Sequence, residues 1–316
     1  MDQRSARIVL IICFVLSNFM IIVECKVLLV KNPYKRTDVF VCGLQAHGKF
    51  ADKVSAYHVL KAKQCFPQGC LYFRWSCSRK NKGLSCKRGY QFVGRLCEGC
   101  SFYQDSKQHL QPKLVLSDPD YQAFLRDVEE FDEWLQTVKD REVATAFRIN
   151  AVKPRFLKEV DGDHGRVRLS GYLLNMEEGF IDREFFQDPF FAITSPGQQE
   201  QYKFAPGDEV EARATIKMDR GRLLLTRLRS VHFESRSSLP TWNNSKALVA
   251  KAAASYFPRQ ATGCLLCPHG ALVDVTETVR NQVVQRRDLY CLAGMPDQTE
   301  CYLYALHKVD LCHHRS

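Results

Sequence analysis

Six cysteines crowd into one short, basic segment of this chain, between Lys61 and Lys113. They follow the spacing C-x4-C-x6-C-x8-C-x10-C-x2-C, at Cys65, Cys70, Cys77, Cys86, Cys97 and Cys100. The same segment carries eleven Lys/Arg residues against two acidic residues, with aromatic residues interleaved. A segment of this length has too little apolar surface to build its own core, so cross-links or a bound metal must hold it.

The positive charge of the chain belongs to its N-terminal third. The 316 residues carry a formal net charge of +10. Residues 1–116 account for +13, residues 117–140 for −6, residues 141–236 for +1 and residues 237–316 for +2. Because the excess is concentrated around the six cysteines, that segment is expected to face phosphate or another anion.

Two cysteine pairs have the C-x2-C spacing that suits a zinc-binding turn and rarely forms a structural disulfide. They are Cys97/Cys100 and Cys264/Cys267. The fourteen cysteines of the chain therefore favour bound metal in a reducing compartment. Disulfides in an oxidising compartment are the alternative.

In the first segment, two short-spaced pairs are expected to come together on hairpins and hold one tetrahedral zinc ion. The expected ligands are Cys65, Cys70, Cys97 and Cys100. This set resembles a four-cysteine zinc ribbon, from which the C-x4-C spacing and two extra cysteines depart. The resemblance implies zinc. An iron–sulfur cluster is the alternative cofactor, because it also needs four thiolates.

The extra thiols of this segment are Cys77 and Cys86. They could form a second site with His58 or His109, pair as a disulfide, or stay buried as thiols. Nothing in their spacing decides between these fates.

The last fifty residues contain a second cysteine module. Its expected metal ligands are Cys264, Cys267, Cys291 and Cys301, and His307 or Cys312 could replace either of the last two. Zinc is the expected metal here as well, since the module begins with a C-x2-C pair.

Basic residues on the loops between the first cysteines are expected to neutralise phosphate while nearby aromatic rings stack on exposed bases. The candidate nucleic-acid-binding residues are Arg74, Arg79, Lys80, Lys82, Lys87, Arg88 and Arg95. The alternative is a solubilising surface around a small core that Phe73, Trp75 and Phe92 only fill.

A helix is expected over residues 117–140, because Ser117 suits the N-cap position and apolar residues follow at helical spacing. From about residue 143 the apolar period changes to two, which predicts strands. Residues 206–210 (PGDEV), an alternating strand, a turn at 218–221 and a return strand over 223–233 resemble the last hairpin of an OB-fold. That resemblance implies a β-barrel, whose ligands vary widely.

Residues 8–23 form an uncharged apolar run, short of the ~20 residues of a comfortable membrane span. Two interpretations are open: a membrane anchor, or translation that starts at Met20 and leaves no anchor. Basic flanking residues favour a cytoplasmic location for the long C-terminal part, tethered to the membrane if the anchor is genuine.

These patterns predict an α+β multidomain protein in five segments. Residues 1–25 are an anchor or a mis-assigned start, and 26–116 are the basic six-cysteine zinc-ribbon-like module. Residues 117–140 are the amphipathic helix, 141–236 the OB-like β-barrel, and 237–316 a helix plus the C-terminal cysteine module.

The expected function is that of a non-enzymatic zinc-binding protein that contacts nucleic acid, single-stranded or RNA. The contact is expected through the basic cysteine module and, secondarily, the barrel. We identify no catalytic signature and infer no small-molecule substrate. The alternatives are a membrane-tethered or exported disulfide-stabilised module that binds a protein partner, and an iron–sulfur redox protein.

Overall fold

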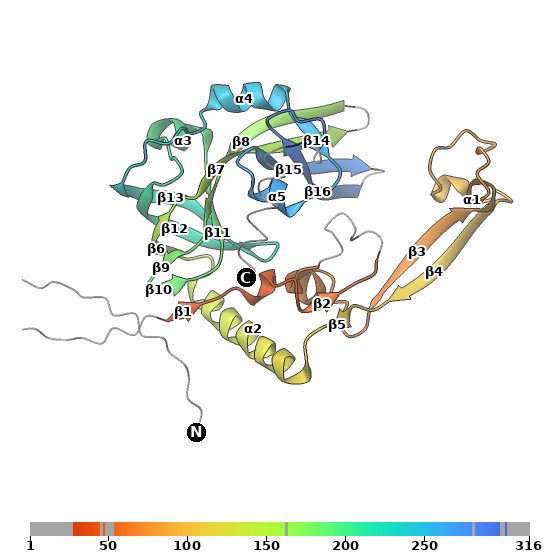
Figure 1. Ribbon diagram of the computed structural model, residues 1–316, viewed down its shortest axis with the longest axis horizontal. Coiled ribbons are helices and arrows are strands. Elements are labelled where there is room, and N and C mark those ends of the chain that lie inside the picture. The colour runs from red at the N-terminus through yellow and green to blue at the C-terminus, as the bar shows by residue number, and fades with distance from the viewer. Residues whose placement is uncertain are drawn as a thin grey trace, which may run out of the picture.

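A mixed β-sheet of twelve strands organises the part of the chain that the computed structural model describes, which is residues 28–44, 47, 54–161, 164–279, 282–297 and 301 (Figure 1). Its strands are β1 (Leu29–Val30), β6 (Glu142–Arg148), β7 (Ala151–Asp161), β8 (His164–Met176), β9 (Gly179–Ile181), β10 (Glu184–Phe186), β11 (Phe190–Thr194), β12 (Glu209–Asp219), β13 (Arg222–Ser235), β14 (Ser255–Phe257), β15 (Gly270–Val279) and β16 (Gln282–Cys291). They are ordered β1-β10-β9-β6-β12-β13-β11-β8-β7-β15-β16-β14.

Two small sheets lie outside the large one. Strands β2 (Phe40–Val41) and β5 (Lys113–Leu114) form one, and β3 (Cys70–Cys77) and β4 (Tyr103–Leu110) form the other. The helices are α1 (Ser78–Asn81), α2 (Asp118–Val138), α3 (Pro196–Tyr202), α4 (Asn244–Ala252) and α5 (Thr262–Leu266). Short turns of 3-10 helix occupy η1 (Pro33–Lys35) and η4 (Arg95–Cys97), and η3 (His58–Ala62) is a π-helical turn.

The expected fold class, an α+β multidomain protein with an OB-like β-barrel between separate modules, is wrong. The large sheet takes β1 from the first expected module and β14, β15 and β16 from the last, and joins them to the strands of 141–236. The reason is non-local pairing: β15 lies parallel to β7, with Asp274 opposite Leu157, and no local sequence pattern encodes that contact.

Local signals in the sequence do define the individual elements. In β12 the buried residues alternate with exposed ones, as a strand with one face on the core requires. The predicted turn at 218–221 is confirmed: Asp219 pairs with Arg222, and Arg220 and Gly221 both have positive φ, of 52° and 78°. Two such residues give the tight turn that matches strand twist in a hairpin.

Helix α2 begins beside Ser117, whose side chain accepts the N–H of Asp120 as an N-cap. Its range agrees with the expected helix, but it packs against the sheet instead of standing as a separate segment. Trp134 stacks on Phe186 of β10, with ring centroids 5.6 Å apart. Nearly two turns from its start, Phe124 belongs to a second core cluster with Phe40. The helix therefore joins two cores.

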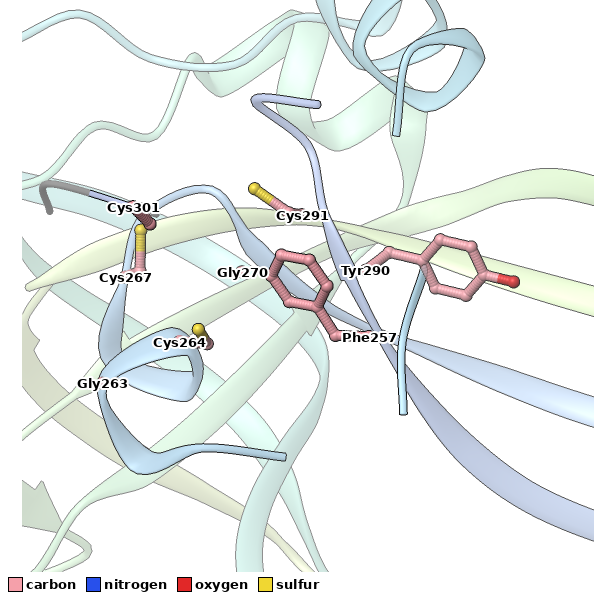
Figure 2. Close-up of a pocket in the computed structure, with 8 residues that line it drawn as sticks. All are labelled: Phe257, Gly263, Cys264, Cys267, Gly270, Tyr290, Cys291 and Cys301. Carbon is pink, nitrogen blue, oxygen red and sulfur yellow. The ribbon is translucent and has the colours of Figure 1, made fainter. Parts of the chain in front are cut away.

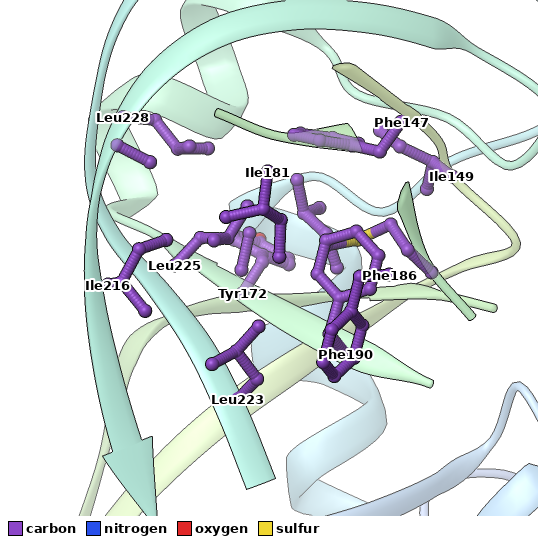
Figure 3. Close-up of a cluster of buried hydrophobic side chains, with 14 of the residues drawn as sticks. Phe147, Ile149, Tyr172, Ile181, Phe186, Phe190, Ile216, Leu223, Leu225 and Leu228 are labelled. Atoms are coloured by element: carbon purple, nitrogen blue, oxygen red, sulfur yellow. The ribbon is translucent and has the colours of Figure 1, made fainter. Parts of the chain in front are cut away.

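The main core lies on the concave side of the large sheet (Figure 3). Side chains from both halves of the strand order, such as Ile181 of β9 and Val273 of β15, belong to the same buried cluster. The sheet must curve around this cluster for them to do so. Its largest fully buried side chains include Tyr172, Phe186 and Phe190.

An ionic network fastens the C-terminal hairpin to the rest of the sheet. Asp274 of β15 accepts from Arg155 of β7 at 2.8 Å and from Arg287 of β16 at 2.7 Å. Arg287 also reaches Asp219 at the β12–β13 turn, at 2.7 Å. Burial alone would raise the pKa of Asp274, but Arg287 and Arg155 outweigh it and hold that pKa below its usual range.

The apolar run at 8–23, Met20, His307 and Cys312 lie outside the described residues. Within the described residues, no helix combines the length and the apolar content needed to cross a bilayer.

Replacing Asp274 by Asn should lower the free energy of unfolding at pH 7 by about 1–3 kcal/mol, because Arg155 and Arg287 lose a charged acceptor. The pKa of Asp274 is lower in the folded state, so its contribution is present above the ordinary aspartate pKa of about 4 and is lost as the pH falls through the folded value. Urea unfolding at several pH values should therefore show the gap between wild type and variant closing in acid.

The control is Glu159→Gln, which removes an exposed ion pair to Arg168 at 4.0 Å. Exposed pairs contribute little, so its stability should match wild type. If the difference in the free energy of unfolding between wild type and Asp274→Asn stayed constant down to pH 2, it would contradict the role assigned to this carboxylate.

Candidate functional site

Four cysteines from distant parts of the C-terminal region line one small cavity (Figure 2). They are Cys264, Cys267, Cys291 and Cys301, and the ring of Phe257 completes the wall. The cavity measures about 20 Å³. A space of that size accepts about one water-sized particle. The structure therefore places all four cysteines of the expected C-terminal site around a cavity that is large enough for a single ion.

Backbone geometry holds the first pair in place. Cys264 lies in α5, and the N–H of Cys267 donates to the carbonyl of Gly263 at 2.9 Å. A Cβ on Gly270 would lie 1.7 Å from the carbonyl oxygen of Cys264, so only glycine allows the start of β15 to pass this close. Cys291, the last residue of β16, pairs with Gly270 across the hairpin.

A buried lysine ties the cysteine loop to the main sheet. Lys153 of β7 is only 5% exposed, and its Nζ donates to the carbonyls of Leu265 at 2.6 Å and Gly270 at 3.3 Å. Burial lowers the pKa of Lys153 to about 8, while Cys267 and Cys264 act in the opposite direction. An amino group beside four thiols would offset negative charge on the sulfurs.

In the structure, the Cys264 thiol disfavours ionisation. Burial, together with repulsion from the neighbouring Cys267, Cys301 and Cys291, raises the pKa of Cys264 to about 11. A divalent cation reverses this, since a coordinating thiol is deprotonated outright. The donor set therefore fits a soft metal ion such as zinc.

The sulfurs do not yet converge on one point. Among the described residues, no three His, Cys, Asp or Glu side chains are placed as ligands of a common ion. All eleven described cysteines are free thiols. Binding at this cavity would require side-chain rotations of the cysteines that line it.

The structure does not bring the expected ligand set of the first segment together. Cys65 is buried in the second core cluster beside Cys42 and Cys70. Cys97 and Cys100 lie at the far end of the β3–β4 hairpin. Strand β3 starts at Cys70 and runs away from the second core cluster, so its whole length separates the two pairs. Sequence spacing could not reveal that a whole strand separates the two pairs.

The β3–β4 hairpin, residues 70–110, projects from the body of the molecule and is called the arm (Figure 1). Its strands pair with each other and with no other described strand. It carries eight Lys/Arg and two acidic residues, a net charge of +6. No residue between Cys65 and Pro112 is buried. The arm is therefore a basic extension without a core.

The candidate basic residues all lie on the arm, in two groups. Arg79, Lys80 and Arg88 donate to backbone carbonyls of the tip loops and so also shape them. The rest point to solvent: Arg74, Lys82, Lys87 and Arg95 are exposed. Within the described residues, none of the seven forms an ion pair. Their charge is thus available to an external anion.

Exposed apolar side chains of β3 lie together on one face of the arm. Leu71, Phe73 and Trp75 alternate along β3, so their side chains share a face, and they are 59%, 55% and 40% exposed. Phe92 at the tip is 84% exposed. These rings are not core residues, which rules out the alternative that they merely fill a small interior.

Sequence reasoning missed Lys153 and Cys42. A single lysine in a strand carries no motif, and its role emerges only because β7 pairs with β15. Cys42 follows a two-residue strand and has no spacing partner.

No protein-family model matches the chain, and a search of curated proteins finds no match.

Replacing Lys153 by Met should lower the free energy of unfolding by about 1–3 kcal/mol, because two buried carbonyls lose their donor. Lys158→Met is the matched control on the same strand, where the side chain is only half-buried. Urea unfolding of both variants tests this. Equal stability of the two would show that the lysine does not anchor the cysteine loop.

Proposed function

We propose that the protein binds zinc at the four-cysteine cavity and contacts nucleic acid, single-stranded or RNA, with the arm. The observation that carries the proposal is the arm itself: a projecting hairpin with a net charge of +6, no described ion pair and an exposed aromatic face. The zinc site contributes stability to the C-terminal hairpin and performs no catalysis.

The charge of the arm favours a polyanion over a protein partner. Exposed apolar rings would suit either kind of partner, but eight lysines and arginines against two acidic residues attract phosphate and repel basic surfaces. Phosphate contacts release counterions from the nucleic acid, so the affinity should fall steeply with salt.

The aromatic face suits unpaired bases. Phe73 and Trp75 lie two residues apart on β3, with Lys107 and Asp105 opposite them on β4. Base stacking on exposed rings contributes about 1–3 kcal/mol per base and tolerates any sequence. A face that combines rings with a flanking lysine therefore favours single strands over duplexes, whose bases are already stacked.

At the cavity, Cys264, Cys267, Cys291 and Cys301 would hold the ion, and Lys153 would offset the charge of the thiolates. When bound, zinc supplies a cross-link between the α5 loop, the end of β16 and the segment at Cys301. A structural zinc site contributes about 10–16 kcal/mol of binding free energy, strongly dependent on pH, so a cavity this small could stabilise the whole hairpin.

The triple variant Arg74→Gln, Lys82→Gln, Arg95→Gln should bind a labelled single-stranded oligonucleotide at least about tenfold more weakly at low salt, since three phosphate contacts are removed. The slope of log K against log salt should shrink by about 2, because each single-strand contact contributes about 0.7. Fluorescence anisotropy over a salt series, with the full-length protein, measures both quantities.

The matched control is Arg166→Gln, Arg183→Gln, Lys217→Gln, which removes three exposed charges from the large sheet and its turns. Its binding should equal that of wild type. Absence of binding by wild type at low salt, or equal losses in the two triple variants, would refute nucleic-acid contact by the arm and favour the protein-partner alternative.

The variant Cys264→Ser, Cys267→Ser should lose about one zinc ion per chain relative to wild type, because serine oxygen is a poor replacement for thiolate. Elemental analysis of anaerobically purified protein measures the loss. Iron in place of zinc, with absorbance near 400 nm, would instead establish the iron–sulfur alternative. Unchanged zinc content in this variant would refute the cavity as the binding site.

A further inference from the structure

The tip of the arm contains four cysteines whose grouping differs from the one expected from spacing. They are Cys77, Cys86, Cys97 and Cys100, and all four are half-buried in a region where most side chains are exposed. Cys77 ends β3 and lies opposite Tyr103, the first residue of β4. Residues 78–102 form the tip between these two residues, and Cys86, Cys97 and Cys100 lie within it.

The tip has no apolar core to hold it. None of its residues belongs to a described hydrophobic cluster. Its regular structure is limited to the four residues of α1 and the three residues of η4, and neither has a side-chain N-cap. A loop of this length held only by a few turns would be expected to sample many conformations, because ordering each residue costs about 1–2 kcal/mol of backbone entropy.

The turns of the tip nevertheless have defined geometry at the cysteines. The N–H of Cys100 donates to the carbonyl of Cys97 at 3.0 Å, and Gly99 between them has a φ of +76°. The N–H of Arg88 donates to the Sγ of Cys86 at 3.4 Å, and Gly89 follows with a φ of +74°. Both glycines have open space at the Cβ position, so the left-handed backbone, not crowding, calls for glycine.

This geometry is the kind that metal-bound thiolates need. A backbone N–H aimed at sulfur stabilises the charged form of the thiol and orients it, as outer partners of metal ligands do. Arg79 and Lys80 donate to the carbonyls of Ser85 and Gln91, so positive charge lies in the same loop as Cys86. Cys97 and Cys100 have the C-x2-C spacing of one half of a structural zinc site, and Cys77 and Cys86 would supply the other two thiolates.

We propose that Cys77, Cys86, Cys97 and Cys100 form a structural zinc site at the tip of the arm, separate from the C-terminal cavity. As described, the four sulfurs do not converge, so the site closes when the ion binds and the thiols rotate inward, each losing its proton. The ion takes the place of the missing core. This adds to the proposed function, since a rigid tip would fix the basic side chains in space, but it stands on different cysteines.

The test uses the full-length protein and the variant Cys86→Ser, Cys97→Ser. It should contain about one zinc ion fewer per chain than wild type, and the combination with Cys264→Ser, Cys267→Ser should lose about two. Unchanged zinc content in the tip variant would overturn the site. Iron and absorbance near 400 nm that vanish with the tip variant, or a disulfide between tip cysteines in wild type, would also overturn it.

Trypsin gives a second measurement that a loss of fold elsewhere would not imitate. Lys80, Lys82, Lys87, Arg88 and Arg95 are cleavage sites within the tip. Cleavage there should speed up by at least about tenfold after chelation of zinc or in the tip variant, because the site no longer holds the loop closed. The cavity variant serves as the control and should leave tip cleavage unchanged. Equal cleavage rates in all proteins would overturn the proposal.

The outcomes separate this site from the proposed function. Loss of tip zinc together with absent oligonucleotide binding by wild type would support the site and refute the nucleic-acid contact. Salt-dependent oligonucleotide binding together with unchanged zinc in the tip variant would do the reverse.

Discussion

The parallel pairing of β15 with β7 is the contact on which the C-terminal site depends. It brings the start of β15, where Gly270 lies against Cys264, next to the strand that carries Lys153. The same pairing places Asp274 between Arg155 and Arg287, so backbone and ionic contacts support one another. Without it, the cysteines would belong to a loose hairpin, too small for a core of its own.

The large sheet and the arm differ in how their structure is stabilised. The large sheet encloses a continuous apolar cluster, and α2 connects that cluster to a second one through Phe131 and Phe124. No arm residue is buried in either cluster, because every residue between Cys65 and Pro112 is at least partly exposed. Four of the described cysteines lie at the tip of the arm, whereas Cys42, Cys65, Cys264 and Cys291 are buried in small apolar clusters outside the main core.

How much could be predicted from sequence depends on how local the determining contact is. The α2 helix and the turn at 218–221 follow from residues adjacent in the chain, namely Ser117 as N-cap and Gly221 in the turn. The twelve-strand sheet does not, because β1 pairs with β10 and β15 pairs with β7 across long stretches of chain. The cysteines show the same division. The C-terminal four, which were expected to share a metal, line one cavity, whereas Cys65 and Cys70 lie a full strand away from Cys97 and Cys100.

The length of the arm has an electrostatic consequence. Each of its strands has eight residues, which at about 3.4 Å per residue separates the tip from the base by about 25 Å. The acidic segment at 117–140, with its charge of −6, follows the base of the arm. At physiological ionic strength the Debye length is about 8 Å, roughly a third of that separation. The acidic segment therefore does not cancel the positive potential of the tip, although the two oppositely charged segments are neighbours along the chain.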